Sequence, residues 1–300
     1  MQNYKIQDLI TYGTNYFADS NLVKHRTYEF YHEGDNTWLA LPNLMDRRVP
    51  FLNQADIVIC PGWPGEQNLN EFIKALQDLS FTIFIPILPG IGQTYGGRTI
   101  EPKGKFSFEK SLELIIDGVE RLLTRDDSRL ILGGYCGGSL IAARIAERYS
   151  EKIDRVFLIN GLFHAQEFFN EGLYSYKEWR GWDAMKRYII DCHMKGRVPL
   201  KGNSEEVFKG FKWLVESDSN IEEIFSKLNI PIAIVHSYYD KIFPYDYCSQ
   251  YFPEKAVVLP FNASHSLKDP ETKINKERDL AALLFKFLSE DGLKTNLFTI

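Results

Sequence analysis

The sequence has few of the features that mark disulfide-rich, nucleic-acid-binding or membrane proteins. Its four cysteines form no Cys-x-x-Cys pair, which argues against a disulfide scaffold and a zinc site. The formal net charge is only −5, so no general attraction to nucleic acid is expected. No apolar run approaches the roughly 18 residues that cross a bilayer, and the first ten residues lack the apolar stretch of a signal peptide. We therefore expect a cytoplasmic protein without a metal ion or a membrane span.

The sequence does contain an alternation of strand-like and helix-like segments. The patterns predict an antiparallel edge hairpin first and then βα units, which together favour an α/β fold with a mostly parallel central sheet flanked by helices. The expected strands cover residues 23–31, 37–41, 55–60, 81–87, 130–132, 155–159, 230–235 and 256–260. The expected helices cover residues 68–79, 108–122 and 280–288, with another directly after Gly134.

The βα alternation stops between residues 161 and 228, a stretch far longer than the 2 to 6 residues usual for loops in α/β units. We interpret it as a helical cap inserted into a core formed by residues 1–160 and 229–300. The segment is rich in aromatic residues. Most of them are expected to form the core of the cap, and the others to line an acyl pocket.

The strongest chemical signal is Gly134-Tyr135-Cys136-Gly137-Gly138, which lies between an expected strand and an expected helix. In such a G-x-nucleophile-x-G elbow the chain turns sharply, and glycines two positions away let the strand and helix approach each other. The start of the helix favours a thiolate, and the Gly137 N–H is free to bind an oxyanion. We predict that Cys136 is a nucleophile; the flanking residues would suit serine equally well.

A nucleophilic cysteine needs a base that an acid orients, in the chain order nucleophile, acid, base. Asp240 follows the strand at 230–235, and His265 follows the strand at 256–260. Because ligands of open α/β sheets bind at the carboxyl ends of the strands, both side chains are expected beside Cys136. His265 is predicted to be the base, and Asp240 to fix its tautomer.

Three further residues are candidates for the same site. The loop Pro61-Gly62-Trp63-Pro64-Gly65 follows the strand at 55–60, and the Trp63 N–H is expected to complete the oxyanion hole with Gly137. Tyr135 and His164 are possible substrate contacts.

These motifs resemble those of the α/β-hydrolase superfamily, over residues 23–288. Residues 61–65 look like its His-Gly-x-Pro-Gly loop, residues 89–94 like its Pro-Gly-x-Gly-x-Ser loop, and residues 240–244 like its Asp-x-x-x-Pro segment. The sequence departs from the family at Pro61, where histidine is usual, and at Cys136, where serine is usual. The elbow also resembles the cysteine boxes of polyhydroxyalkanoate synthases, dienelactone hydrolases and carrier-dependent aminoacyl or acyl transferases.

This resemblance leaves several functions open. The first is an acyl or aminoacyl transferase that forms a thioester on Cys136 and needs no cofactor, its substrate being carried on a phosphopantetheine thiol. The alternatives are a thioesterase or an ester or lactone hydrolase of the same fold, and a non-catalytic binding protein. Residues 177–212 hold nine Lys or Arg and five Asp or Glu, so an acidic carrier protein is the predicted partner at the cap.

Overall fold

The computed structural model describes twelve stretches of the chain. They are residues 29–33, 36–41, 56–62, 69–79, 81–88, 90, 93–95, 98–100, 108–123, 130–194, 203–217 and 221–288.

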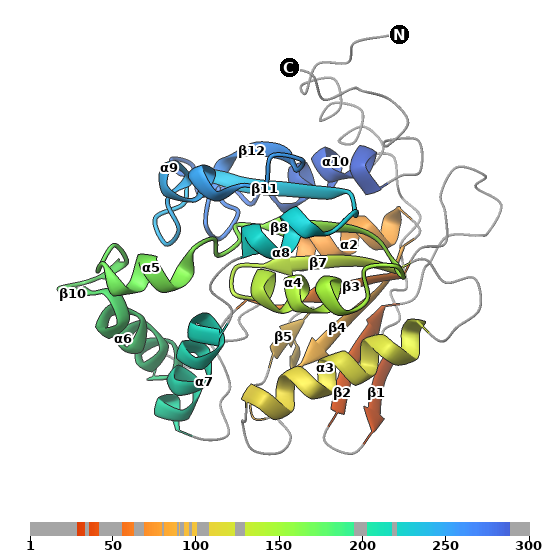
Figure 1. Cartoon of the computed structure of the whole chain (residues 1–300), viewed down its shortest axis with the longest axis horizontal. Coiled ribbons are helices and arrows are strands. Elements are labelled where there is room, and N and C mark those ends of the chain that lie inside the picture. The colour runs from red at the N-terminus through yellow and green to blue at the C-terminus, as the bar shows by residue number, and fades with distance from the viewer. Residues whose placement is uncertain are drawn as a thin grey trace, which may run out of the picture.

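The described chain is organised around one eight-stranded sheet, with strand order β1-β2-β4-β3-β7-β8-β11-β12 (Figure 1). Its strands are β1 (Glu29–Glu33), β2 (Asn36–Leu41), β3 (Asp56–Cys60), β4 (Thr82–Ile87), β7 (Leu130–Tyr135), β8 (Ile153–Ile159), β11 (Ile232–Tyr239) and β12 (Val257–Ser264). The six strands from β4 to β12 are parallel, whereas β2 runs antiparallel to both β1 and β4. The predicted edge hairpin and mostly parallel sheet are therefore confirmed.

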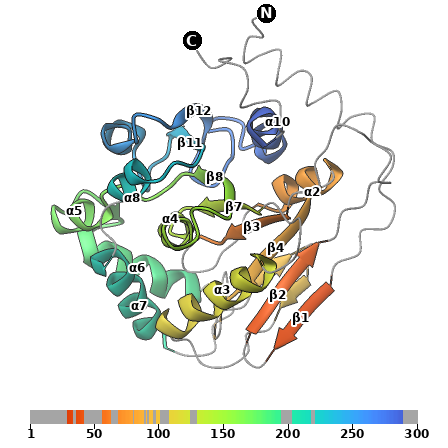
Figure 2. The ribbon, with the colours of Figure 1, turned by 45° about the vertical axis from the view of Figure 1, so that its right-hand side comes forward.

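Helices cover both faces of the sheet (Figures 1 and 2). They are α2 (Asn70–Asp78), α3 (Phe108–Leu123), α4 (Gly138–Arg148), α5 (Ala165–Asn170), α6 (Gly181–Met194), α7 (Ser204–Ser217), α8 (Ile221–Lys227), α9 (Tyr245–Cys248) and α10 (Glu277–Leu288). On one face α2 packs against α10, and on the other α4 packs on β7 with α8 beside it. A sheet covered on both faces needs strands that are apolar throughout, and β3, β4 and β7 are buried along almost their whole length.

The carboxylate of Glu277 in α10 joins the two helices on their shared face. It accepts hydrogen bonds from the N–H groups of Glu71 and Phe72 at 2.7 and 3.1 Å. These N–H groups lie in the first turn of α2, where a helix has no internal partners for its donors. The cap of α2 therefore comes from a residue about 200 positions later in the chain.

In the segment predicted as an insertion, residues 161–228, the described residues add no strand to the main sheet. Its described part holds α5, α6, α7, α8 and a short ribbon of β9 (Ser175–Tyr176) and β10 (Trp179–Arg180). Phe169 and Trp182 stack at a ring-centroid distance of 4.6 Å and both contact Phe211, so aromatic rings form the centre of this helical group. Helix α8 packs on α4, next to the sheet. The division of the chain at 161 and 228 stays a prediction.

Several local features differ from the sequence-based expectation. Strand β7 ends at Tyr135 and β12 ends at Ser264, three and four residues beyond their expected ends. Strand β11 continues to Tyr239, four residues beyond its expected end, and so brings Asp240 to the strand terminus itself. A second small ribbon, β5 (Gln93–Tyr95) with β6 (Arg98–Ile100), follows β4 in the chain.

Among the helices of the described residues, none has both the length and the apolar character needed to cross a membrane.

Gly133 in β7 packs against the Phe157 ring of β8. A Cβ added at this glycine would lie only 2.3 Å from the ring, so no side chain fits there. We expect Gly133→Ala to destabilise the protein by about 1–3 kcal/mol and Phe157→Ala by about 3–5 kcal/mol. The double variant should lose at least about 1 kcal/mol less than the sum, since the new methyl group enters the vacated space. Chemical denaturation measures all three.

The control pairs Gly133→Ala with Glu147→Ala, whose side chain is 45% exposed on α4. These two changes should be additive within about 0.5 kcal/mol. Additivity of the Gly133 and Phe157 changes would contradict the packing described for the two central strands.

Candidate active site

Cys136 lies on the sharp turn between β7 and α4, with a left-handed φ of +52°. At this turn the backbone of β7 lies close to α4, and α4 lies close to the end of β3. A Cβ at Gly134 would lie 2.7 Å from the Ser139 Cα, and one at Gly138 would lie 2.2 Å from the Cys60 carbonyl oxygen. The glycines of the motif therefore have the steric role that the sequence predicts for them.

A hydroxyl that the sequence analysis did not single out stabilises this strained turn. The Ser139 hydroxyl donates to the Cys136 carbonyl at 2.6 Å and accepts from the Leu162 N–H at 2.9 Å. The Cys136 N–H in turn donates to the carbonyl of Ile159 at the end of β8. The elbow is thus bonded to the segment after the neighbouring strand, which holds the cysteine in one position.

Asp240 follows directly on β11 and is 4% exposed. One carboxylate oxygen, Oδ1, accepts the N–H groups of Ile242 and Phe243 at 2.8 and 2.9 Å. The other, Oδ2, lies 2.7 Å from Nδ1 of His265. Each oxygen of this buried carboxylate has a donor, so the side chain is fixed in the orientation that meets the imidazole.

His265 lies in the loop after β12 and joins the acid to the cysteine. Burial alone would lower the pKa of this imidazole. The carboxylate of Asp240 and the nearby Cys136 outweigh burial and raise the pKa well above 6.5. Because Nδ1 is bonded to Asp240, Nε2 is the ring nitrogen available to exchange a proton with the sulfur.

Asn160 and Tyr135 position the His265 loop. The Asn160 amide donates to the His265 carbonyl at 2.9 Å, and its oxygen accepts the N–H of Ser237 in β11 at 2.8 Å. The Tyr135 hydroxyl donates to the same His265 carbonyl at 3.0 Å. The sequence analysis did not predict a role for Asn160. Its position directly after the strand at 155–159, where the site residues of such a sheet lie, could have indicated one. Tyr135, a predicted substrate contact, lines the cavity and also supports the base.

The predicted oxyanion hole is described only in part. Gly137 is the N-cap residue of α4, where backbone N–H groups have no partner within the helix. Gly62 lies against the elbow, since a Cβ there would be 3.4 Å from the Cys136 Cβ. Trp63, the other predicted donor, lies outside the described residues.

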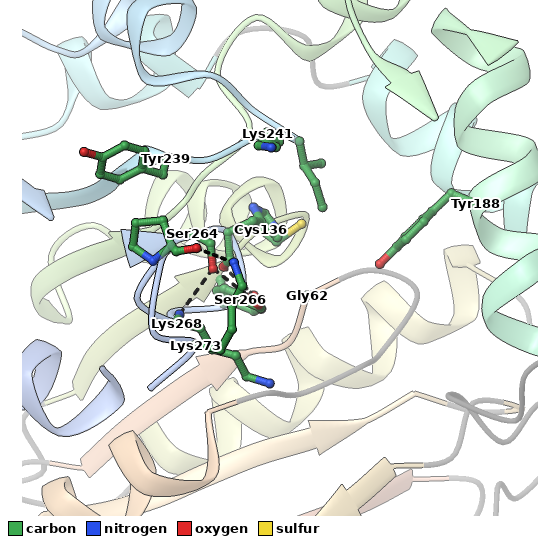
Figure 3. Close-up of a pocket in the computed structure, with 13 residues that line it drawn as sticks. Gly62, Cys136, Tyr188, Tyr239, Lys241, Ser264, Ser266, Lys268 and Lys273 are labelled. Atoms are coloured by element: carbon green, nitrogen blue, oxygen red, sulfur yellow. Dashed lines mark hydrogen bonds between the residues drawn. The ribbon is translucent and has the colours of Figure 1, made fainter. Parts of the chain in front are cut away.

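A cavity of about 670 Å³ is lined by Cys136 and His265 (Figure 3). Tyr188 of α6 points into it from the helical group, as Figure 3 shows, so residues of the predicted cap and of the sheet loops share one site. The described residues that line it are Gly62, Tyr135, Cys136, Tyr188, Tyr239, Lys241, Ile242, Ser264, His265, Ser266, Lys268, Pro270 and Lys273.

His164 is not among these lining residues. Its ring stacks on Tyr251 at 3.8 Å, and its nitrogens lie 3.3 Å from a Glu167 oxygen and 3.6 Å from a Glu222 oxygen. These contacts give it a structural role rather than the predicted contact with substrate.

His236 is fully buried in β11, where burial lowers its pKa, and its Nε2 donates to the Phe243 carbonyl at 2.8 Å. It therefore supports the loop that carries the acid.

The sheet order, the single antiparallel strand and the elbow after β7 agree with the comparison to known families. Residues 57–192 match the family model described as the alpha/beta hydrolase fold. The chain has the α/β-hydrolase fold. No curated protein matches it significantly in sequence.

Solved structures share the α/β-hydrolase fold at low sequence identity. A putative lipase from Acinetobacter baumannii AYE is 14% identical with a TM-score of 0.57, covering 96% of this chain and 97% of its own. A serine hydrolase involved in carbazole degradation is 14% identical with a TM-score of 0.56, covering 88% and 99%. The thioesterase domain from the curacin biosynthetic pathway is 14% identical with a TM-score of 0.51, covering 87% and 100%.

We expect Asp240→Asn to lower the pKa of His265, because burial then acts without the opposing carboxylate. NMR titration of the imidazole Cε1–H measures the change. The raised pKa also stabilises the folded protein below pH 6.5, an effect that is lost as the pH rises through the folded-state value. The stability difference between wild type and Asp240→Asn should therefore shrink at alkaline pH. An unchanged pKa would contradict the arrangement.

Iodoacetamide at neutral pH should modify one of the four cysteines, Cys136, because it alone lines the cavity. Cys60, Cys192 and Cys248 are at most 1% exposed. Burial also raises the pKa of Cys60 to about 12 and raises that of Cys248. Intact-mass and peptide mass spectra locate the adduct.

The matched variants are Cys136→Ala, which should remove the adduct, and Cys192→Ala, which should keep it. Preferential modification of Cys60, Cys192 or Cys248 in the native protein would contradict the assignment.

Proposed function

We propose that this protein is an acyl-transfer enzyme that carries its acyl group as a thioester on Cys136. The observation that supports this is one constellation: a cysteine on a left-handed elbow, in the same cavity as a histidine whose Nδ1 lies 2.7 Å from a buried carboxylate. Nucleophile, base and orienting acid are the parts that covalent acyl transfer requires.

In the first half-reaction the Cys136 sulfur attacks the carbonyl carbon of the acyl donor. The sulfur proton passes to Nε2 of His265, and the carbonyl oxygen takes up negative charge opposite the Gly137 N–H. The tetrahedral intermediate then breaks its bond to the leaving group, which receives the proton from His265. The products are the free leaving group and a thioester on Cys136.

In the second half-reaction His265 removes a proton from the acceptor, which attacks the Cys136 thioester. The carbon–sulfur bond to Cys136 breaks, and the sulfur recovers its proton or remains a thiolate beside the imidazolium. The Asp240 carboxylate keeps Nδ1 protonated throughout, so that Nε2 alone changes state. A thiol acceptor gives transfer, whereas water gives hydrolysis.

A cysteine favours thioester donors and thiol acceptors. Exchange of one thioester for another is nearly neutral in free energy, so an acyl group on Cys136 stays activated for a second thiol. A serine ester lacks this property, since its return to a thiol is uphill. The proposed substrates are therefore acyl or aminoacyl thioesters of the phosphopantetheine type.

The proposed partner is an acidic carrier protein that docks at the cap. Lys177, Lys186 and Arg187 form ion pairs with Asp191 or Glu205 on the same group of helices. The excess positive charge of residues 177–212 comes mainly from Lys195, Arg197 and Lys201, which lie outside the described residues. The structure thus leaves carrier docking as a prediction.

The second candidate is hydrolysis of thioesters, esters or lactones at the same triad. It is favoured by the structural neighbours, whose names include a lipase, a serine hydrolase and a thioesterase domain. A non-catalytic binding protein is the third candidate; the close His265–Asp240 pair beside Cys136 argues against it.

Transfer and hydrolysis are separated by following a radiolabelled acyl group from an acylated carrier protein in the presence of a free acceptor carrier. We expect the label on the acceptor, with a transient adduct on Cys136. Cys136→Ala and His265→Ala should each lower the rate by about 10³-fold or more.

Free acid as the sole product would end the transferase proposal in favour of hydrolysis. Full retention of activity in both variants would contradict the triad itself.

A further inference from the structure

Three lysines line the cavity that contains Cys136: Lys241, Lys268 and Lys273. In the view of Figure 3, Lys241 lies above the cysteine, and Lys268 and Lys273 lie below it. All three residues are exposed. Among the described residues, no acidic side chain lines the cavity. The carboxylate of Asp240, the proposed catalytic acid, is buried and hydrogen-bonded to His265.

The backbone that carries these lysines is well ordered by hydrogen bonds. Lys241 directly follows the proposed catalytic acid. Lys268 and Lys273 belong to the loop after His265, which is closed by bonds from Ser264 N–H to the Lys268 carbonyl and from Lys273 N–H to the Asp269 carbonyl. The loop therefore holds the base and two lysine backbones in a set relationship.

None of the three ammonium groups forms an ion pair with a carboxylate of the described residues. Lys227, Lys276 and Lys186 show the contrast, because each pairs with a carboxylate on the protein surface. Lys273 donates instead to the neutral carbonyl of Pro270. The Asp269 carboxylate nearby accepts the N–H groups of Glu271 and Thr272 within the loop.

We infer that the cavity binds an anionic group of the substrate, a carboxylate or a phosphate, through Lys241, Lys268 and Lys273. A cavity lined by three cationic side chains, and by no carboxylate among the described residues, favours an anionic group. That group would belong to the same molecule as the carbonyl that Cys136 attacks. The Ser264 and Ser266 hydroxyls line the same cavity and supply neutral donors. This inference deepens the proposed function by naming the charge of its substrate.

Two parts of an acyl thioester can carry such an anion. One is a carboxylate at the far end of the acyl chain, as in a dicarboxylic monothioester. The other is the phosphate of the phosphopantetheine leaving group. Both present the same chemistry to the lysines, and the experiments below distinguish them.

The first test compares the rates at which iodoacetate, an anion, and iodoacetamide, its neutral analogue, alkylate Cys136 in the full-length protein. The iodoacetate-to-iodoacetamide rate ratio should fall about tenfold in the triple variant Lys241→Gln, Lys268→Gln, Lys273→Gln. High salt should lower the wild-type ratio toward that of the triple variant. The His265 charge is common to both proteins and cancels in the comparison.

Lys152→Gln is the matched control. Lys152 is exposed in the turn before β8, at the opposite ends of the strands from Cys136, and does not line the cavity. This variant should keep the wild-type ratio. A triple variant that also kept the ratio, within about twofold, would overturn the inference.

The second test needs no reactive cysteine. Glutarate, its neutral diamide and inorganic phosphate are each added to wild type and to the triple variant, and the melting temperature is measured. Stabilisation of the wild type by glutarate alone assigns the site to an acyl-chain carboxylate, and stabilisation by phosphate assigns it to the donor phosphate. No anion effect beyond that in the triple variant would contradict the inference.

The two tests separate this inference from the proposed function. A Cys136 that resists both reagents, in a protein whose melting temperature rises with an anion only when the lysines are present, would contradict the nucleophile and keep the anion site. A reactive Cys136 whose rate ratio and melting temperature ignore the lysines would keep the nucleophile and end the anion site.

Discussion

The left-handed backbone at Cys136 is the constraint on which the rest of the site depends. For a residue with a side chain this conformation costs about 1–2 kcal/mol, so it persists only where the surrounding structure holds it. Here β7 pairs with strands on both sides, α4 packs closely through Gly138, and Ser139 bonds the Cys136 carbonyl. The sheet thus provides the stability that keeps one sulfur exposed to the cavity.

The proposed acid and base are aligned by contacts that run between strands. Asp240 ends β11, His265 follows β12, and Asn160 at the end of β8 bonds to the backbone of both segments. Because three neighbouring parallel strands end at one edge, short side chains suffice to link their loops. Burial lowers the dielectric around this network, which strengthens the Asp240–His265 interaction and gives it control over the proton on Nε2.

The same two loops decide the charge of the cavity. The acid of the proposed triad is buried and hydrogen-bonded to His265, whereas the three lysines are exposed and line the cavity that a substrate would fill. The negative charge of this site is therefore buried against the imidazole, whereas its positive charges are exposed along the cavity. In the function we propose, proton transfer and anion binding would then depend on different residues of one loop pair.

Local pattern was sufficient for much of this protein. Apolar runs and helical spacing predicted the parallel sheet, and the glycines around Cys136 predicted the elbow, because sterics within five residues determine that turn. The chain order of Asp240 and His265 also followed from motifs. Only the tertiary structure decided that Asn160 joins the two loops, that His164 packs on Tyr251 and does not line the cavity, and that lysines from separate loops line the same cavity as Cys136. Those relations are distances between segments far apart in the chain, which strand order and helix packing set and no short sequence window contains.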